Sequence, residues 1–178
     1  AEEIAGSEER LRGISMSDEL KVWVGKLEDV DVMMELAIEG CYENSFVKPN
    51  HERLLREIWP ALSRENGIVG FVGVPGEKPQ GAILLRICHV WYSDDEILEE
   101  RAVFIHPDFR AAKGGRARKL CEFSKQVSDE LGIPLTIGVM SSQRTAGKVR
   151  MYERIFGPPS GAYFLYGTRT GTWKQAAE

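Results

Sequence analysis

The 178-residue chain has few cysteines, no long apolar run and no excess of positive charge. Its three cysteines, Cys41, Cys88 and Cys121, lie far apart and lack the close pairing of a zinc site or a disulfide framework. No apolar run approaches the roughly 20 residues of a membrane span. The acidic N-terminus also lacks the basic-then-apolar order of a signal peptide. We therefore expect a cytoplasmic protein with no metal site and no contact with a membrane.

The charge balance excludes a further class of protein. Lys and Arg total 23 against 27 Asp and Glu, which gives a net charge of -4, so binding of nucleic acid is not expected except through a local patch. Hydrophobic residues make up 43% of the chain and charged residues 28%, as in an ordinary globular domain. A length of 178 residues allows one domain with a substantial core but would crowd two.

Apolar periodicity predicts one mixed α/β domain over residues 18–167. Residues 1–17 are polar without a sustained apolar period and are interpreted as an N-terminal extension, with residues 168–178 as a C-terminal tail. The strands are predicted at residues 20–25, 68–74, 82–92, 100–107, 133–140 and 161–167. The helices are predicted at residues 27–46, 49–67, 115–132 and 144–157, with a kink at Pro60.

The stretch HPDFRAAKGGRARKL, residues 106–120, gathers positive charge around two glycines. Its basic residues are Arg110, Lys113, Arg116, Arg118 and Lys119. A strand that stops at Pro107 leads into this turn, and the turn opens directly into a helix. The first N–H groups of a helix have no partner within it, and the helix dipole favours an anion there. The pattern predicts an anion site, with a solvated basic helix face as the plainer interpretation.

The order of elements and this turn resemble the GNAT superfamily of N-acetyltransferases over about residues 18–167. In that family the turn reads Q/R-x-x-G-x-G/A and holds the pyrophosphate of acetyl-coenzyme A. Gly115 and Ala117 match the pattern, whereas Ala112 stands where the family has Gln or Arg. The segments FIHPDFR and VMSSQRTAGKVRMYERIFG add to the resemblance, and RAAKGGRARKL is similar to GNAT-type proteins of phages and prophages.

The resemblance implies a single domain with a mixed, mostly antiparallel central sheet flanked by helices, the GNAT or acyl-CoA N-acyltransferase fold. It also implies acetyl-CoA as cosubstrate. The residues expected to bind it are Phe104, Ile105, Arg110, Lys113, Gly114, Gly115, Arg116, Ala117 and Arg118. Backbone N–H groups near Phe104 and Ile105 would stabilise the oxyanion, and Arg110 or Lys113 would replace the side chain missing at Ala112.

Two residues are expected to act in catalysis. Tyr152 matches the family position that protonates the departing thiolate, and Glu99 lies where some members place a general base. In a regular strand Glu100 would point to the opposite face. The implied reaction is transfer of an acetyl group to a primary amine by direct attack, and the sequence leaves the acceptor open.

Other interpretations stay open at this stage. Ala112 and Thr145 depart from the family pattern, so the alternative is a non-catalytic GNAT-like module that binds coenzyme A or a protein partner. Tyr152 would then be a packed aromatic residue. The last predicted strand, at residues 161–167, leaves a sheet edge that a second copy could cover in a homodimer.

Overall fold

The computed structural model describes residues 19–142, 144–170 and 173. Its elements are β1 (Lys21–Val24), η1 (Leu27–Asp29), α2 (Val30–Asn44), α3 (His51–Leu62), β2 (Gly67–Gly73), β3 (Gly81–His89), β4 (Glu96–Ile105), η2 (Pro107–Phe109), α4 (Arg116–Leu131), β5 (Leu135–Thr136) and α5 (Thr145–Phe156). The extension predicted at residues 1–17 lies outside the described residues. None of the described helices combines the length and the apolarity of a membrane span.

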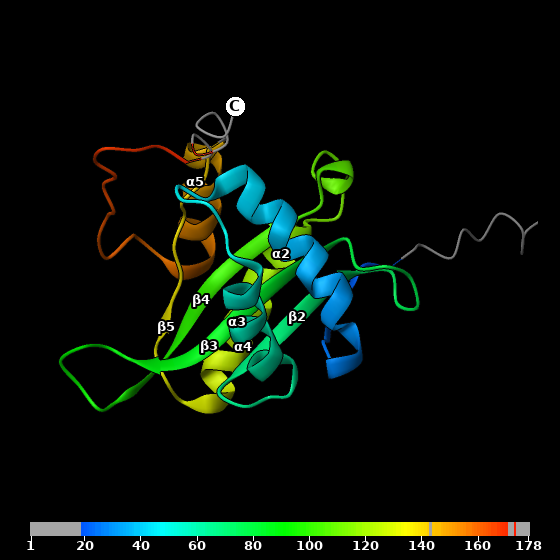
Figure 1. Ribbon diagram of the computed structural model, residues 1–178, viewed down its shortest axis with the longest axis horizontal. Coiled ribbons are helices and arrows are strands. Elements are labelled where there is room, and N and C mark those ends of the chain that lie inside the picture. Colours follow the sequence, from blue (N-terminus) through cyan, green and yellow to red (C-terminus); the bar gives the residue numbers. More distant parts are fainter. Residues whose placement is uncertain (1–18, 143, 171–172, 174–178) are drawn as a thin grey trace, which may run out of the picture.

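The strands form one sheet in the order β1-β2-β3-β4-β5. The first three pairings are antiparallel, and β4 pairs with β5 in parallel. The predicted mixed, mostly antiparallel sheet is therefore confirmed. Helices α2 and α3 lie on one face of this sheet and α4 on the other, while α5 packs against α4 (Figure 1).

Two cores lie on the two faces of the sheet. Met33, Ile58 and Phe71 belong to the core beneath α2 and α3, and each is buried. Leu98, Leu120 and Val127 belong to the core beneath α4. The apolar face of each helix thus packs against the apolar side of the strands. Burial of this apolar surface is the main contribution that stabilises a layered domain.

A β-bulge in β4 decides which side chains reach each core. Leu85 pairs with Glu100 and Leu84 with Ala102, so Arg101 is an extra residue with no partner on β3. Leu98 packs in the core beneath α4, but Phe104 packs in the core beneath α2 and α3. In a regular strand two residues six positions apart would share a face. The bulge reverses the facing of the second half of β4.

Two predicted strands are shorter than expected or absent. Of the apolar run at residues 133–140 only Leu135 and Thr136 form a ladder, and residues 161–167 form no strand. A strand requires a partner for its backbone groups as well as suitable side chains. Apolar composition reports only the second requirement. The predicted strand at residues 161–167 was therefore wrong, whereas the one at residues 133–140 is confirmed only at Leu135 and Thr136. Pro60 lies inside α3, which continues to Leu62.

Candidate functional site

The turn between β4 and α4 holds its shape through two consecutive glycines. Gly114 has φ 122 and Gly115 has φ 61, both in the region that L-residues rarely adopt. A Cβ at Gly114 would lie 2.2 Å from Cδ1 of Leu20, whereas a Cβ at Gly115 would meet only Cβ of Arg118 at 3.8 Å. Gly114 is therefore required for packing, and Gly115 leaves open space in front of the helix.

The first turn of α4 begins at this open space. Gly115 is the N-cap residue, and no side chain caps the helix there. The N–H groups of Arg116, Ala117 and Arg118 belong to the first turn, where no carbonyl within the helix can accept from them. Together with the helix dipole they favour an anion at this position.

Two of the five basic residues in this stretch, Arg110 and Arg116, reach other elements of the fold. Arg116 is buried, donates from Nε to Oε1 of Gln80 at 2.6 Å and from Nη1 to the carbonyl of Lys113 at 3.0 Å. Arg110 donates to the carbonyl of Ile105 at 2.9 Å and pairs with Glu43 of α2 at 2.6 Å. Both guanidinium groups therefore brace the turn.

The side chains of Lys113 and Arg118 lie at the surface of the turn instead. Arg118 pairs with Glu122 at 2.8 Å, and both side chains are largely exposed. Such a surface pair is worth about 0–1 kcal/mol, so a ligand anion could replace its carboxylate at small cost. Lys113 and Arg118 are thus the exposed cations of this turn.

β4 presents a free backbone edge next to this turn. Its ladder with β5 stops at the pair Glu99–Thr136 within the described chain. His106 donates its N–H to Gln80 on the β3 side, and Ile105 accepts from Arg110 on the other side. Because backbone groups alternate along a strand, the N–H of Ile105 faces the free edge and that of Phe104 faces β3. Of these two residues, Ile105 is the one placed to donate to a ligand.

Three titratable side chains from three elements meet on the α4 face of the sheet. The Tyr152 hydroxyl of α5 lies close enough to the Cys121 thiol of α4 for each group to shift the pKa of the other, and the Glu100 carboxyl of β4 acts on both groups. Burial raises the pKa of Glu100 to about 7, against the opposing effect of the Gly138 N–H, which donates to it at 3.3 Å. Burial likewise raises the pKa of Tyr152 and brings that of Cys121 to about 12.

Glu99 lies on the opposite face of β4. Its Oε2 accepts from the Cys88 thiol at 3.3 Å and pairs with Arg101, which also lies 3.3 Å from Glu57 of α3. The two residues expected to act in catalysis, Tyr152 and Glu99, are therefore not brought together. Glu100 is the carboxyl that shares a face with Tyr152.

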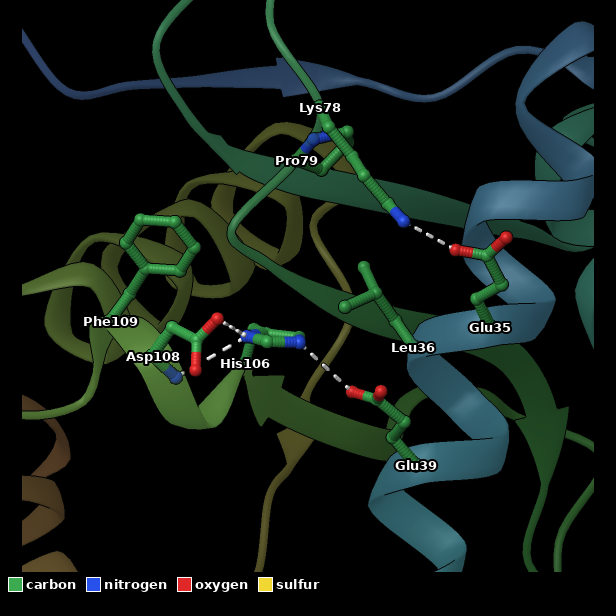
Figure 2. A pocket seen from close by; sticks show the side chains of 8 residues that line it. All are labelled: Glu35, Leu36, Glu39, Lys78, Pro79, His106, Asp108 and Phe109. Atoms are coloured by element: carbon green, nitrogen blue, oxygen red, sulfur yellow. Dashed lines mark hydrogen bonds and ion pairs between the residues drawn. The ribbon is translucent and has the colours of Figure 1, made fainter.

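Helix α2 carries three carboxylates at four-residue intervals, and each reaches a basic side chain. The pairs are Glu35 with Lys78 at 2.6 Å, Glu39 with His106 at 3.4 Å, and Glu43 with Arg110 at 2.6 Å. The first two pairs border a cavity of about 280 Å³ between α2 and η2, shown in Figure 2. Its charged groups are paired with one another, and among the described residues no group of His, Cys, Asp or Glu is placed to hold a metal.

Comparison with solved structures identifies the fold. A possible acetyltransferase from Clostridium difficile 630 matches with a TM-score of 0.63 at 16% identity, over 83% of this chain and 95% of that chain. The chain has the GNAT acetyltransferase fold. The aminoglycoside acetyltransferase meta-AAC0020 from an uncultured soil metagenomic sample, in complex with sisomicin, matches this GNAT fold with a TM-score of 0.60 at 15% identity, over 85% and 98% of the two chains.

A third neighbour was solved with a coenzyme A derivative. AAC(6')-Iy in complex with the bisubstrate analog CoA-S-monomethyl-acetylneamine has a TM-score of 0.61 at 14% identity, over 84% of this chain and 98% of that chain. No protein-family model and no curated protein matches the sequence. At these identities the likeness shows the GNAT fold alone.

Three site residues were missed by the sequence reasoning. Gln80 and Glu43, which hold Arg116 and Arg110, come from distant parts of the chain and carry no local pattern. Cys121 follows Leu120 on α4, and only the packing of α5 brings Tyr152 to it. A helical wheel of α4 would have shown Cys121 on its buried side, but not its partner.

Proposed function

We propose that this protein transfers an acetyl group from acetyl-CoA to a primary amine, with the pyrophosphate bound at the turn before α4. The observation that carries the proposal is the Gly114–Gly115 turn, which opens an uncapped helix N-terminus beside open space. A phosphate needs close approach to backbone N–H groups, and this turn allows it. Lys113 and Arg118 would add charge-assisted contacts.

The residues around the turn fit the remainder of such a ligand. When bound, acetyl-CoA supplies a thioester whose acyl carbon an amine can attack. The free edge of β4 would receive its pantetheine arm, and the N–H of Ile105 would donate to the acyl oxygen. Phe104 would contribute packing beneath α2, where its ring lies 3.1 Å from the position of a Cβ on Gly40. Arg110 and Arg116 would hold the turn in its binding shape.

Tyr152 is the proposed proton donor to the departing sulfur. Its raised pKa keeps the hydroxyl protonated at neutral pH, which a general acid requires. For the proton that leaves the amine, Glu100 fits better than Glu99, because Glu100 shares a face with Tyr152. A carboxyl with a pKa of about 7 can accept a proton near neutral pH.

The decisive experiment compares two glycines at opposite ends of α4. Gly115 and Gly132 have φ 61 and φ 67, and neither has a close neighbour at its Cβ position. Valine at either position strains the backbone by about 1–3 kcal/mol. We expect Gly115→Val to weaken acetyl-CoA binding at least about 100-fold, measured by calorimetry, because the side chain fills the space where the phosphate would lie.

The control is Gly132→Val, which should lose similar stability and bind acetyl-CoA like the native protein. Unchanged affinity in a folded Gly115→Val protein would refute the proposed site. Release of coenzyme A from a panel of small amines, aminoglycosides, peptides and protein N-termini, followed by liquid chromatography, then separates an enzyme from a binding module. Binding without release for any amine would favour the module.

A further inference from the structure

Lys148 of α5 carries a half-buried amine that the proposed mechanism does not use. It lies four residues before Tyr152, so the two side chains share a face of α5 and start roughly 6 Å apart along the helix axis. The Glu100 carboxyl of β4 acts on the Tyr152 hydroxyl. The face of α5 that carries Lys148 is therefore the one directed toward β4.

The loop before α5 is fastened to the end of α2. Ser142 donates its hydroxyl to the carbonyl of Glu43 at 3.1 Å and its N–H to Oδ1 of Asn44 at 3.3 Å. The carboxylate of Glu43 pairs in turn with Arg110, which lies between β4 and α4. The first turn of α5 is therefore held next to the end of β4.

Lys148 lies among these groups. Glu43 and Arg110 are both close enough to Lys148 to shift the pKa of its amine. Arg110 also donates to the carbonyl of Ile105 at the free edge of β4. In the proposed function the N–H of Ile105 holds the acyl oxygen of acetyl-CoA. The Lys148 amine then lies on the side of β4 where the thioester would be bound.

The surroundings of Lys148 favour the neutral form of its amine. Burial lowers the pKa of Lys148, and Arg110 and Arg144 lower it further against the opposing charge of Glu43. Lys148 is also in the first turn of α5, where the helix dipole disfavours a cation. A desolvated amine beside other cations is the environment in which lysine serves as a nucleophile.

We propose that Lys148 is itself an acetyl acceptor, so that the protein acetylates this residue from bound acetyl-CoA. The inference rests on the proposed function, because it requires the thioester beside the free edge of β4. The amine nitrogen bonds to the acyl carbon as the bond from carbon to sulfur breaks. The nitrogen loses a proton to Glu100, and Tyr152 gives a proton to the sulfur. Return of the proton from Glu100 to Tyr152 leaves an amide on Lys148 and the free thiol of coenzyme A.

Position distinguishes Lys148 from a lysine at the surface. Lys125 of α4 is exposed, and its Nζ lies 3.5 Å from the carbonyl of Ile155. A nucleophile held beside a bound thioester reacts faster than one that meets the thioester from solution. Lys125 therefore reports the background reaction of acetyl-CoA with an ordinary lysine.

The test incubates the full chain with acetyl-CoA and no added amine, and peptide mass spectrometry follows each lysine. We expect Lys148 to gain an acetyl group at least about tenfold faster than Lys125. The first-order rate constant should stay the same from about 1 to 50 µM protein, because the acetyl group moves within one chain. Gly115→Val should abolish acetylation of Lys148 and leave that of Lys125, because only Lys148 depends on bound coenzyme.

Lys148→Arg keeps the cation without an acceptor amine, and should bind acetyl-CoA within about threefold of the native affinity. Lys125→Arg is the matched control and should leave acetylation of Lys148 unchanged. Calorimetry on the native protein separates the two proposals. If acetyl-CoA does not bind, the proposed function fails and this inference fails with it. If acetyl-CoA binds but Lys148 is acetylated no faster than Lys125, this inference alone is overturned. A rate constant that rises in proportion to protein concentration would also overturn it.

Discussion

The Tyr152 hydroxyl lies among groups that keep its proton in place. Burial, then the neighbouring Cys121 and Glu100, raise its pKa above the ordinary value for tyrosine. A phenol in this position stays protonated at neutral pH and can donate a hydrogen bond. Tyr152 is therefore available as the proton donor that we propose.

We predict that Tyr152→Phe lowers kcat for a suitable amine roughly 100-fold, because it removes the donor and keeps the ring. Acetyl-CoA affinity should stay within about twofold. The matched control is Tyr163→Phe, since Tyr163 is 88% exposed and should be indifferent to the change. Stopped-time assays measure kcat, and calorimetry measures the affinity for acetyl-CoA. An equal loss of rate and binding would indicate a structural tyrosine, and full activity would assign the proton to water.

The raised pKa of Glu100 predicts how the free energy of unfolding depends on pH. Its pKa is raised to about 7 by burial, from an ordinary value of 4.5, so the folded protein holds this proton more tightly than the unfolded chain. The contribution of this residue to stability is therefore fully present below about pH 4.5 and is lost as the pH rises through about 7. The loss amounts to at most about 3 kcal/mol.

We predict that Glu100→Gln removes this dependence, because an amide keeps the shape and cannot ionise. Urea unfolding at pH 5 and pH 8 should show a smaller fall in the free energy of unfolding for the variant than for the native protein. Glu99→Gln, on the other face of β4, serves as the comparison and should leave most of that fall in place, because burial is the larger cause of the raised pKa of Glu100. A native protein equally stable at both pH values would contradict the burial of the Glu100 carboxylate.

At the scale of an element, the turn before α4 has both buried and exposed cations. Arg116 and Gln80 are buried and hydrogen bonded to each other, whereas Lys113 is exposed. We predict that Arg116→Met destabilises the protein by about 1–3 kcal/mol, because the amide oxygen of Gln80 loses its donor. Lys113→Met should change stability by less than about 0.5 kcal/mol.

The two variants should rank the other way in a direct binding measurement. Lys113→Met should weaken acetyl-CoA binding several-fold by removing a cation from the surface of the turn. Urea unfolding and calorimetry on the same samples check both rankings. If Arg116→Met is as stable as Lys113→Met, the bracing role of Arg116 is wrong.

The elements that sequence reasoning predicted best are those whose signals are local. The stop of α4 at Gly132, where φ is 67, and the strand–turn–helix order around Gly115 follow from residue types within a few positions. The inward position of Arg116 depends on Gln80, 36 residues away, and no local pattern contains it. For residues 161–167 the side chains indicate a strand, but the partner that a strand needs is not adjacent in this chain.

For the whole molecule, charge predicts which partners are excluded. The net charge is -4, and two of the cations near the turn, Arg110 and Arg116, are engaged with protein groups. We predict a dissociation constant above about 100 µM for duplex and single-stranded DNA at 150 mM salt, weaker than ordinary non-specific binders. Fluorescence anisotropy at 50 and 200 mM salt checks it. Tight binding with a steep salt dependence would restore a nucleic-acid role.

The extra residue in β4 shifts the alternation of side chains between the two faces of the sheet by one position. Before Arg101 even-numbered residues such as Leu98 face α4, and after it even-numbered residues such as Phe104 face α2. One insertion therefore lets a single strand present the Glu100 carboxyl to Tyr152 while its end reaches the other core. Deleting Arg101 would restore a regular alternation of side chains along the whole of β4. The side chains of Phe104 and Ile105 would then point to the opposite faces of the sheet. The two halves of β4 thus face different cores because of a residue whose own side chain points toward Glu57 of α3.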